Sequence, residues 1–173
     1  AKNLTTICIN INCINIYLLR EAEDEIKQVQ FKTEHHKLMI NLLYTTSWLQ
    51  RMQSGVLRPH DITPEQYNIL RILRGSKGQP MSLNDISSRM IDRASNTSRL
   101  IDKLVIKKWA IRKICPNDRR QSEIAITEKG LEVLDKLQKP IDDITEQFSI
   151  ISVNDCKKFN QALDEIRNIN NPS

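Results

Sequence analysis

Residues 81–130 read MSLNDISSRMIDRASNTSRLIDKLVIKKWAIRKICPNDRRQSEIAITEKG. Apolar residues recur at helical spacing over residues 83–90 and again over residues 94–107, with a short polar turn between the two runs. Ser82 caps the first run, with Asp85 at the third helical position to complete a capping-box-like pair. Two shorter runs, residues 110–115 and 122–126, have strand character and enclose a polar, cationic tip. Two helices followed by a hairpin, in this order, predict a winged helix-turn-helix.

The first turns of the second helix carry small or hydrogen-bonding side chains, whereas Leu100, Ile101, Leu104 and Val105 form its buried stripe. A helix that enters the major groove of DNA presents its N-terminal residues to base edges and phosphates. The candidate DNA-binding residues of this helix are therefore Ser95, Asn96, Thr97, Ser98, Arg99 and Lys103. The alternative is that Ser95 and Asn96 only cap the helix.

The hairpin tip carries Asp118, Arg119 and Arg120. A narrow minor groove has an enhanced negative potential that attracts an inserted Arg side chain. We therefore expect Arg119 or Arg120 to reach the minor groove, while Asp118 holds a neighbouring guanidinium group in position. The alternative is that the tip is charged only for solubility.

The positive charge of the chain is concentrated in one segment. Its 26 Lys and Arg residues against 21 Asp and Glu residues give a net charge of +5 over 173 residues. Residues 89–120 hold ten of these cations and three Asp, a net +7, so the rest of the chain sums to about −2. A basic run is often only a solvated face, but its coincidence with a helix-turn-helix favours a nucleic-acid phosphate backbone as partner.

Helices are also predicted on the N-terminal side of this segment. Residues 33–54 form an amphipathic pattern that Gly55 should end, and its apolar face is broad enough for burial on more than one side. Thr63 is a natural N-cap for a further helix over residues 64–74, with Gln66 at the third position.

On the C-terminal side, a helix is expected over residues 127–149, with a kink at Pro140, and a last helix to about residue 169. Both carry apolar stripes. Pairing them with the 33–54 helix across a two-fold axis is the simplest way to bury these stripes, so we expect a homodimer.

The remaining features favour a non-enzymatic cytoplasmic protein. Cys8, Cys13, Cys115 and Cys156 show no paired spacing, so a reduced compartment is expected. Residues 7–19 are too short and too polar to span a bilayer, and we expect their apolar side chains to pack on protein. His35 and His36 are adjacent and cannot readily share a metal, and no catalytic grouping is recognisable. We therefore predict no enzyme activity, no metal and no cofactor.

Residues of about 34 to 168 resemble the MarR family of winged-helix transcriptional regulators. The resemblance is carried by residues 62–67, by residues 83–104, by Asp118 to Arg120 and by residues 126–130, where Ile126 replaces the Leu of the family. It implies a homodimer that binds a palindromic operator in double-stranded DNA, with recognition helices in the major groove and wings in the minor groove. Most relatives repress transcription until a small ligand or oxidation relieves them. Peroxide-sensing members carry a cysteine in the first long helix, and residues 33–54 here have none.

The predicted fold class is mainly α with a small β-wing, in which N- and C-terminal helices form a dimerisation domain around a winged helix-turn-helix. The predicted division is an N-terminal extension 1–32, a dimerisation helix 33–57, a DNA-binding domain 58–130 and C-terminal dimerisation helices 131–173. The predicted function is a cytoplasmic, homodimeric transcriptional repressor with a small-molecule effector. The alternative is a winged-helix protein-interaction module that does not bind DNA.

Overall fold

The computed structural model describes residue 27 and residues 30–114 and 122–169. Three of the four cysteines, residues 1–26 and the hairpin tip with Asp118, Arg119 and Arg120 lie outside the described residues. The expectations about them therefore stay predictions.

The chain divides into two compact units, Ala1–Thr46 and Ser47–Ser173, and helix α2, Glu34–Leu57, begins in the first and ends in the second. In the first unit the Thr33 side chain caps the helix, because its Oγ1 accepts a hydrogen bond from the His36 N–H at 3.1 Å. The long helix predicted from the sequence is confirmed.

The predicted end of that helix at Gly55 is wrong, because α2 continues to Leu57. A Cβ atom added at Gly55 would meet nothing within 4 Å, so the glycine is an ordinary helical residue. The 3-10 turn η1, Arg58–His60, follows directly, and it ends at Asp61, whose backbone is left-handed with φ 53°.

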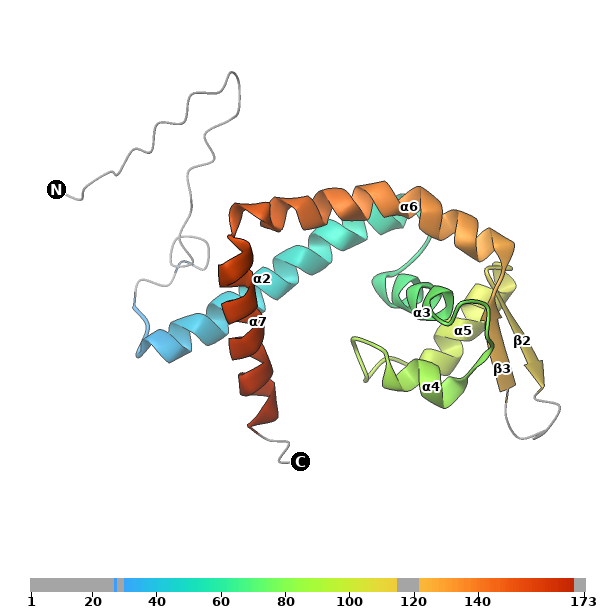
Figure 1. The fold of residues 1–173 in the computed structure, drawn as a ribbon, viewed down its shortest axis with the longest axis horizontal. Helices are drawn as coiled ribbons and strands as arrows, with labels where there is room; N and C mark the ends of the chain where they lie inside the picture. The colour runs from blue at the N-terminus through green and yellow to red at the C-terminus, as the bar shows by residue number, and fades with distance from the viewer. Residues whose placement is uncertain (1–26, 28–29, 115–121, 170–173) are drawn as a thin grey trace, which may run out of the picture. The chain divides into compact units, whose positions relative to one another are not determined.

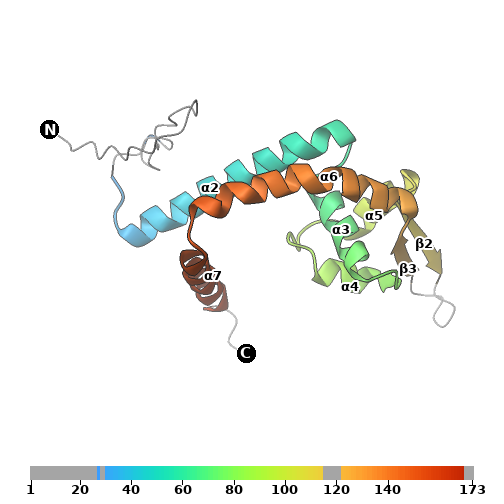
Figure 2. The same ribbon diagram turned by 45° about the horizontal axis from the view of Figure 1, so that its top comes forward.

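The second unit contains three short helices packed beside a small sheet (Figures 1 and 2). The helices are α3, Pro64–Gly75, α4, Leu83–Ser88, and α5, Thr97–Ile106. The strands are β1, Met81–Ser82, β2, Ala110–Ile114, and β3, Ser122–Ile126, which pair antiparallel in the order β1-β3-β2. Helices α4 and α5 with the β2–β3 hairpin are the predicted winged helix-turn-helix.

The core of this unit is formed where the helices meet the sheet and α6, Glu128–Glu146. Its largest fully buried side chains come from the end of α2 and from α3, α4, α5, β3 and α6: Leu57, Ile69, Leu70, Leu73, Ile86, Ile101, Leu104, Ile124, Leu134 and Leu137. The apolar stripe predicted for the second helix is confirmed, since Ile101 and Leu104 are buried and Leu100 and Val105 pack against them.

Both predicted capping boxes are present. The Thr63 hydroxyl accepts from the Gln66 N–H at the start of α3, and the Gln66 side chain accepts from the Thr63 N–H. The Ser82 and Asp85 side chains make the same reciprocal pair at the start of α4. Each box satisfies backbone donors that the first helical turn leaves open, so the starts of α3 and α4 follow from local sequence.

Helix α5 begins at Thr97 and not at residue 94 as predicted. Asp92 explains the difference, because its carboxylate accepts from the Ala94 N–H at 3.0 Å and from the Ser95 hydroxyl at 2.9 Å. These two bonds stabilise a turn, as Asp side chains commonly do, and Asn96 becomes the N-cap.

A single residue, Thr127, separates β3 from α6. Its N–H donates to the Trp109 carbonyl at 3.1 Å, and its hydroxyl donates to the Lys108 carbonyl at 2.7 Å. The same hydroxyl accepts from the Gly130 N–H at 3.1 Å and caps α6. The junction between hairpin and helix is thus held by three hydrogen bonds.

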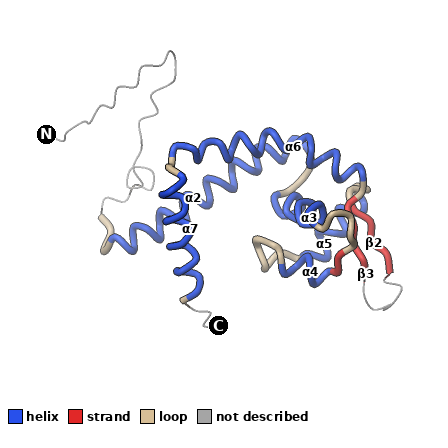
Figure 3. The backbone as a smooth tube through the Cα atoms, in the orientation of Figure 1, coloured by secondary structure: helices blue, strands red, loops and turns tan. Residues whose placement is uncertain are grey.

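Helix α6 continues through Pro140, is followed by the 3-10 turn η2, Gln147–Ile150, and precedes α7, Val153–Asn168 (Figure 3). The last helix is confirmed, with Ser152 as its N-cap. It has no buried residue, and Phe159 is 58% exposed. Within the described residues, none of the helices combines the length and the hydropathy needed to cross a membrane.

Candidate nucleic-acid interface

The exposed face at the start of α5 borders a surface depression of about 300 Å³. Its lining consists of Glu65 from α3 and five residues from α5 and the turn before it: Ser95, Asn96, Arg99, Leu100 and Lys103. Arg99 and Lys103 are four residues apart and therefore neighbours on one face of the helix. Four of the predicted DNA-binding residues thus lie together.

Asn96 and Ser95 also have structural roles. The Asn96 Oδ1 accepts from the Arg99 N–H at 3.1 Å, and the Ser95 hydroxyl donates to Asp92. Capping is therefore one role of Asn96, as the alternative interpretation of the sequence held. The cap leaves the residue exposed at the N-terminal end of the helix, where the helix dipole favours a negatively charged ligand.

The two other predicted residues of this helix face protein. Thr97 is only 6% exposed, and its hydroxyl lies 3.4 Å from the Ser87 hydroxyl at the end of α4. The Ser98 hydroxyl accepts from Arg112 Nη2 at 3.4 Å. In the described geometry these side chains join α5 to α4 and to β2, respectively.

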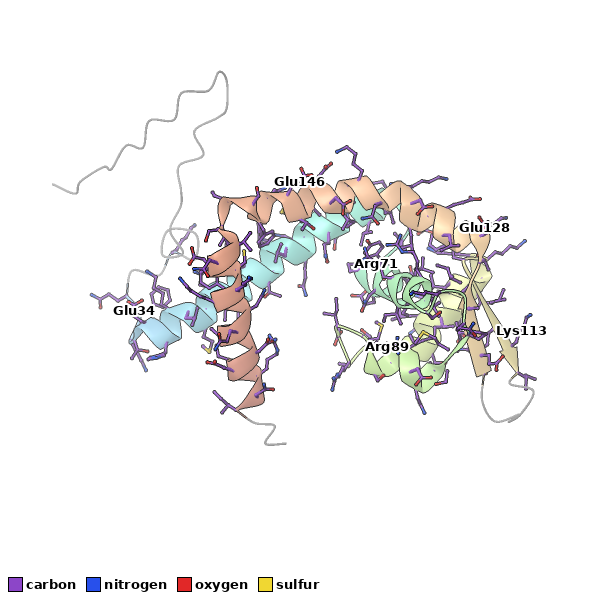
Figure 4. All side chains as sticks on the ribbon, viewed as in Figure 1. Glu34, Arg71, Arg89, Lys113, Glu128 and Glu146 are labelled. Atoms are coloured by element: carbon purple, nitrogen blue, oxygen red, sulfur yellow. The ribbon has the colours of Figure 1, made fainter. Side chains whose placement is uncertain are left out.

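Arg112 is a residue of this region that the sequence did not single out. Its Nη1 donates to the Asp102 carboxylate of α5 at 2.8 Å, and its side chain is 29% exposed. The charge count included Arg112, but no local pattern connects it with a partner ten residues earlier. Figure 4 shows its strand neighbour Lys113, which is exposed on β2, and Arg89, which is exposed at the end of α4.

A second cavity, of about 480 Å³, lies beside the C-terminal half of α5. Its lining includes Ser54 and Arg58, three residues at the start of α3, and three on and after α5: Thr63, Pro64, Gln66, Lys103, Ile106 and Lys107. Lys107 Nζ pairs with the Asp61 carboxylate at 2.8 Å and lies 4.7 Å from the centre of the Trp109 ring. This contact ties the end of α5 to the turn before α3.

No group of three His, Cys, Asp or Glu side chains in the described part of the chain could hold a metal ion. The arrangement at α5 instead offers exposed cations and amide groups at a helix N-terminus. Such a surface can bind phosphates through charge and read base edges through hydrogen bonds.

The chain is similar in sequence to known transcriptional regulators. The family model described as "MarR family" matches residues 62–122. The HTH-type transcriptional regulator MhqR of Bacillus subtilis (strain 168) is 28% identical over 111 residues, which are 64% of this chain and 75% of that protein.

Solved structures share the fold. Sco3205, a MarR family transcriptional regulator from Streptomyces coelicolor solved in complex with DNA, aligns with a TM-score of 0.71 at 19% identity, over 83% of this chain and 92% of that one. The PcaV transcriptional regulator of the same organism, solved in complex with its natural ligand, aligns with a TM-score of 0.61 at 17% identity, over 72% of this chain and 90% of that one.

Proposed function

We propose that this chain is a DNA-binding transcriptional regulator of the MarR family, and that it acts as a homodimeric repressor of a palindromic operator that a small ligand relieves. The observation that carries the proposal is the exposed face of α5, where Asn96, Arg99 and Lys103 border one depression. Asn and Arg can make bidentate contacts to adenine and guanine, and Lys can contact phosphate.

The proposed site keeps all the residues expected from the sequence but divides their roles. Ser95, Asn96, Arg99 and Lys103 would face DNA, while Thr97 and Ser98 would hold the helix. Arg119 or Arg120, with Asp118, remains our candidate for the minor groove. The negative potential of a narrow minor groove would favour these Arg side chains over uncharged ones.

Two separate sets of exposed apolar side chains support a homodimer. In the first unit Leu43 on α2 is 63% exposed, and Leu38 and Met39 are about half exposed. In the second unit α7 exposes Phe159 and Ile166, which are seven residues apart and share one face of the helix. Exposed apolar surface of this kind marks protein interfaces, and a second copy of the chain would cover it across a two-fold axis. We therefore propose residues 33–57 and 131–173 for dimerisation and residues 58–130 for DNA binding.

The cavity of about 480 Å³ is our candidate for the effector site. Its volume lies within the range usual for small-molecule sites, and it lies between the end of α2, the start of α3 and α5. A ligand bound there would contact Lys103 and Lys107 on the recognition helix, so it could change the position of that helix. A cytoplasmic location would fit this role.

Replacing Arg99 with alanine is expected to weaken operator binding by about tenfold to hundredfold, because one good base contact contributes about 1–3 kcal/mol. The operator is first selected from a pool of random duplexes, and its affinity is then measured by fluorescence anisotropy against a non-operator duplex. The variant should lose affinity mainly for the operator.

Lys136→Ala is the matched control, because Lys136 is an exposed cation on α6 away from the depression. It should bind the operator as the wild type does. Equal losses in both variants would mean that only overall charge matters. If the wild-type protein selects no duplex and shows no salt-dependent binding, the protein-interaction module is the better interpretation.

Replacing Phe159 with glutamate is expected to convert the dimer into a monomer, because it places a charge in the apolar face of α7. Light scattering should give twice the 20.1 kDa chain mass for the wild type and a single chain mass for the variant. Lys157→Glu is the control, since residue 157 lies on the other side of the helix by its spacing. A wild-type mass of one chain would contradict the proposed dimer.

A further inference from the structure

The side chain of Arg112 spans one turn of the recognition helix. Its two terminal nitrogens reach Ser98 at 3.4 Å and Asp102 at 2.8 Å, which are four residues apart on α5. Arg112 itself belongs to β2, the first strand of the wing. These two hydrogen bonds therefore join the elements that the winged-helix fold uses to contact DNA.

The sheet determines the direction of this side chain. Side chains alternate between the two faces of a strand, and on β2 the buried Ala110 and the half-buried Arg112 share the face toward α5, whereas Ile111 is exposed. Arg112 is paired in register with Ile124, which is fully buried on β3. The backbone at Arg112 is thus fixed, and its guanidinium group is brought over the helix.

The guanidinium group is poorly placed for a phosphate contact. Its Nε is buried and has no hydrogen-bond partner among the described residues, and its Nη1 is paired with a carboxylate. Asp102 itself is an unfavourable residue for a helix that lies against DNA, because its charge repels phosphates. The ion pair with Arg112 gives a structural reason for an acidic residue on a helix that would lie against DNA.

We propose that Arg112 is a positioning residue that sets the direction of α5 relative to the wing through Ser98 and Asp102. It acts on DNA through the exposed face of α5 and does not contact the phosphates itself. This inference rests on the proposed DNA-binding function and assigns Asp102 a favourable role in it.

The decisive variant is Asp102→Asn, which is nearly isosteric and removes a negative charge from the recognition helix. Simple electrostatics predicts tighter binding to DNA, whereas loss of positioning predicts weaker binding. We expect operator affinity to fall on the order of tenfold, a usual size for coupling between two sites. Arg112→Gln should cause a similar loss, and Arg112→Lys should recover part of it, because the cation can still reach Asp102.

Two measurements separate positioning from other roles. The slope of log affinity against log salt should match that of the wild type in Asp102→Asn and Arg112→Gln, because no phosphate contact is lost. Thermal unfolding midpoints should change little, since the Asp102 side chain is 55% exposed and ion pairs at the surface contribute little to stability. Glu132→Gln is the control for charge, because it removes an exposed acid of α6 that does not border the depression and should leave operator binding unchanged.

Tighter binding by Asp102→Asn would overturn the inference, as would a salt slope reduced by about one phosphate contact in Arg112→Gln. Unchanged operator affinity in both variants would also overturn the inference about Arg112. That result would leave the proposed DNA binding intact. If the wild-type protein and the Glu132→Gln control also fail to bind any selected duplex, the proposed function itself is wrong.

Discussion

Gly130→Ala is expected to destabilise the protein by on the order of 3 kcal/mol, because the new methyl group has no space. A Cβ atom at this position would lie 2.3 Å from the Trp109 carbonyl oxygen and 2.8 Å from Ile126 Cγ1. The nearer atom belongs to the backbone and cannot rotate away. Relief of the overlap would therefore move α6 or break the bond between Thr127 and Trp109.

Chemical denaturation followed by circular dichroism measures this effect as a lower midpoint with an unchanged slope. Gly55→Ala is the matched control, because Gly55 lies within α2 with open space around it. Alanine is a better helix former by about 0.5–1 kcal/mol, so the control should be as stable as the wild type or more stable. A Gly130→Ala protein of wild-type stability would show that the approach of the two segments is looser than described.

Leu104→Ala is expected to cost about 2–5 kcal/mol, as the removal of a fully buried leucine side chain usually does. Leu104 is 0% exposed and lies in the core cluster from α5. The loss combines the transfer of apolar atoms to water in the unfolded state with the cavity that remains. Because the same helix carries Arg99, the variant should also bind the operator more weakly as its folded fraction falls.

Ile106→Ala on the same helix provides the comparison, because Ile106 is 79% exposed and its truncation should change stability by less than about 0.5 kcal/mol. The two variants share the helix and the kind of substitution and differ in burial. Equal stabilities, measured by denaturation, would contradict the core described for this unit.

Local signals in the sequence predicted most of the helix starts. The Thr63 and Ser82 caps act within four residues, so composition and spacing were sufficient to place α3 and α4. The start of α5 was placed three residues early, because Asp92 accepts hydrogen bonds from the following turn. Strand β1 was not predicted, since its two residues are defined by pairing with β3 more than forty residues later.

The sequence predicted which residues share the exposed face of the candidate site. It did not predict the direction of each side chain. Helical spacing placed Arg99 and Lys103 together, and the structure has them border one depression. The burial of Thr97 depends on α4, and the bonds of Arg112 depend on how β2 crosses α5. Contacts of this kind join two different elements. The spacing of residues within one element cannot predict them.

The Thr127 junction leaves no room for a hinge. One residue separates β3 from α6, and its donors and its hydroxyl oxygen are already bonded to Trp109, Lys108 and Gly130. We therefore expect the hairpin and α6 to move together. A change in the direction of α6 would then also change the direction of strand β3 and its partner β2.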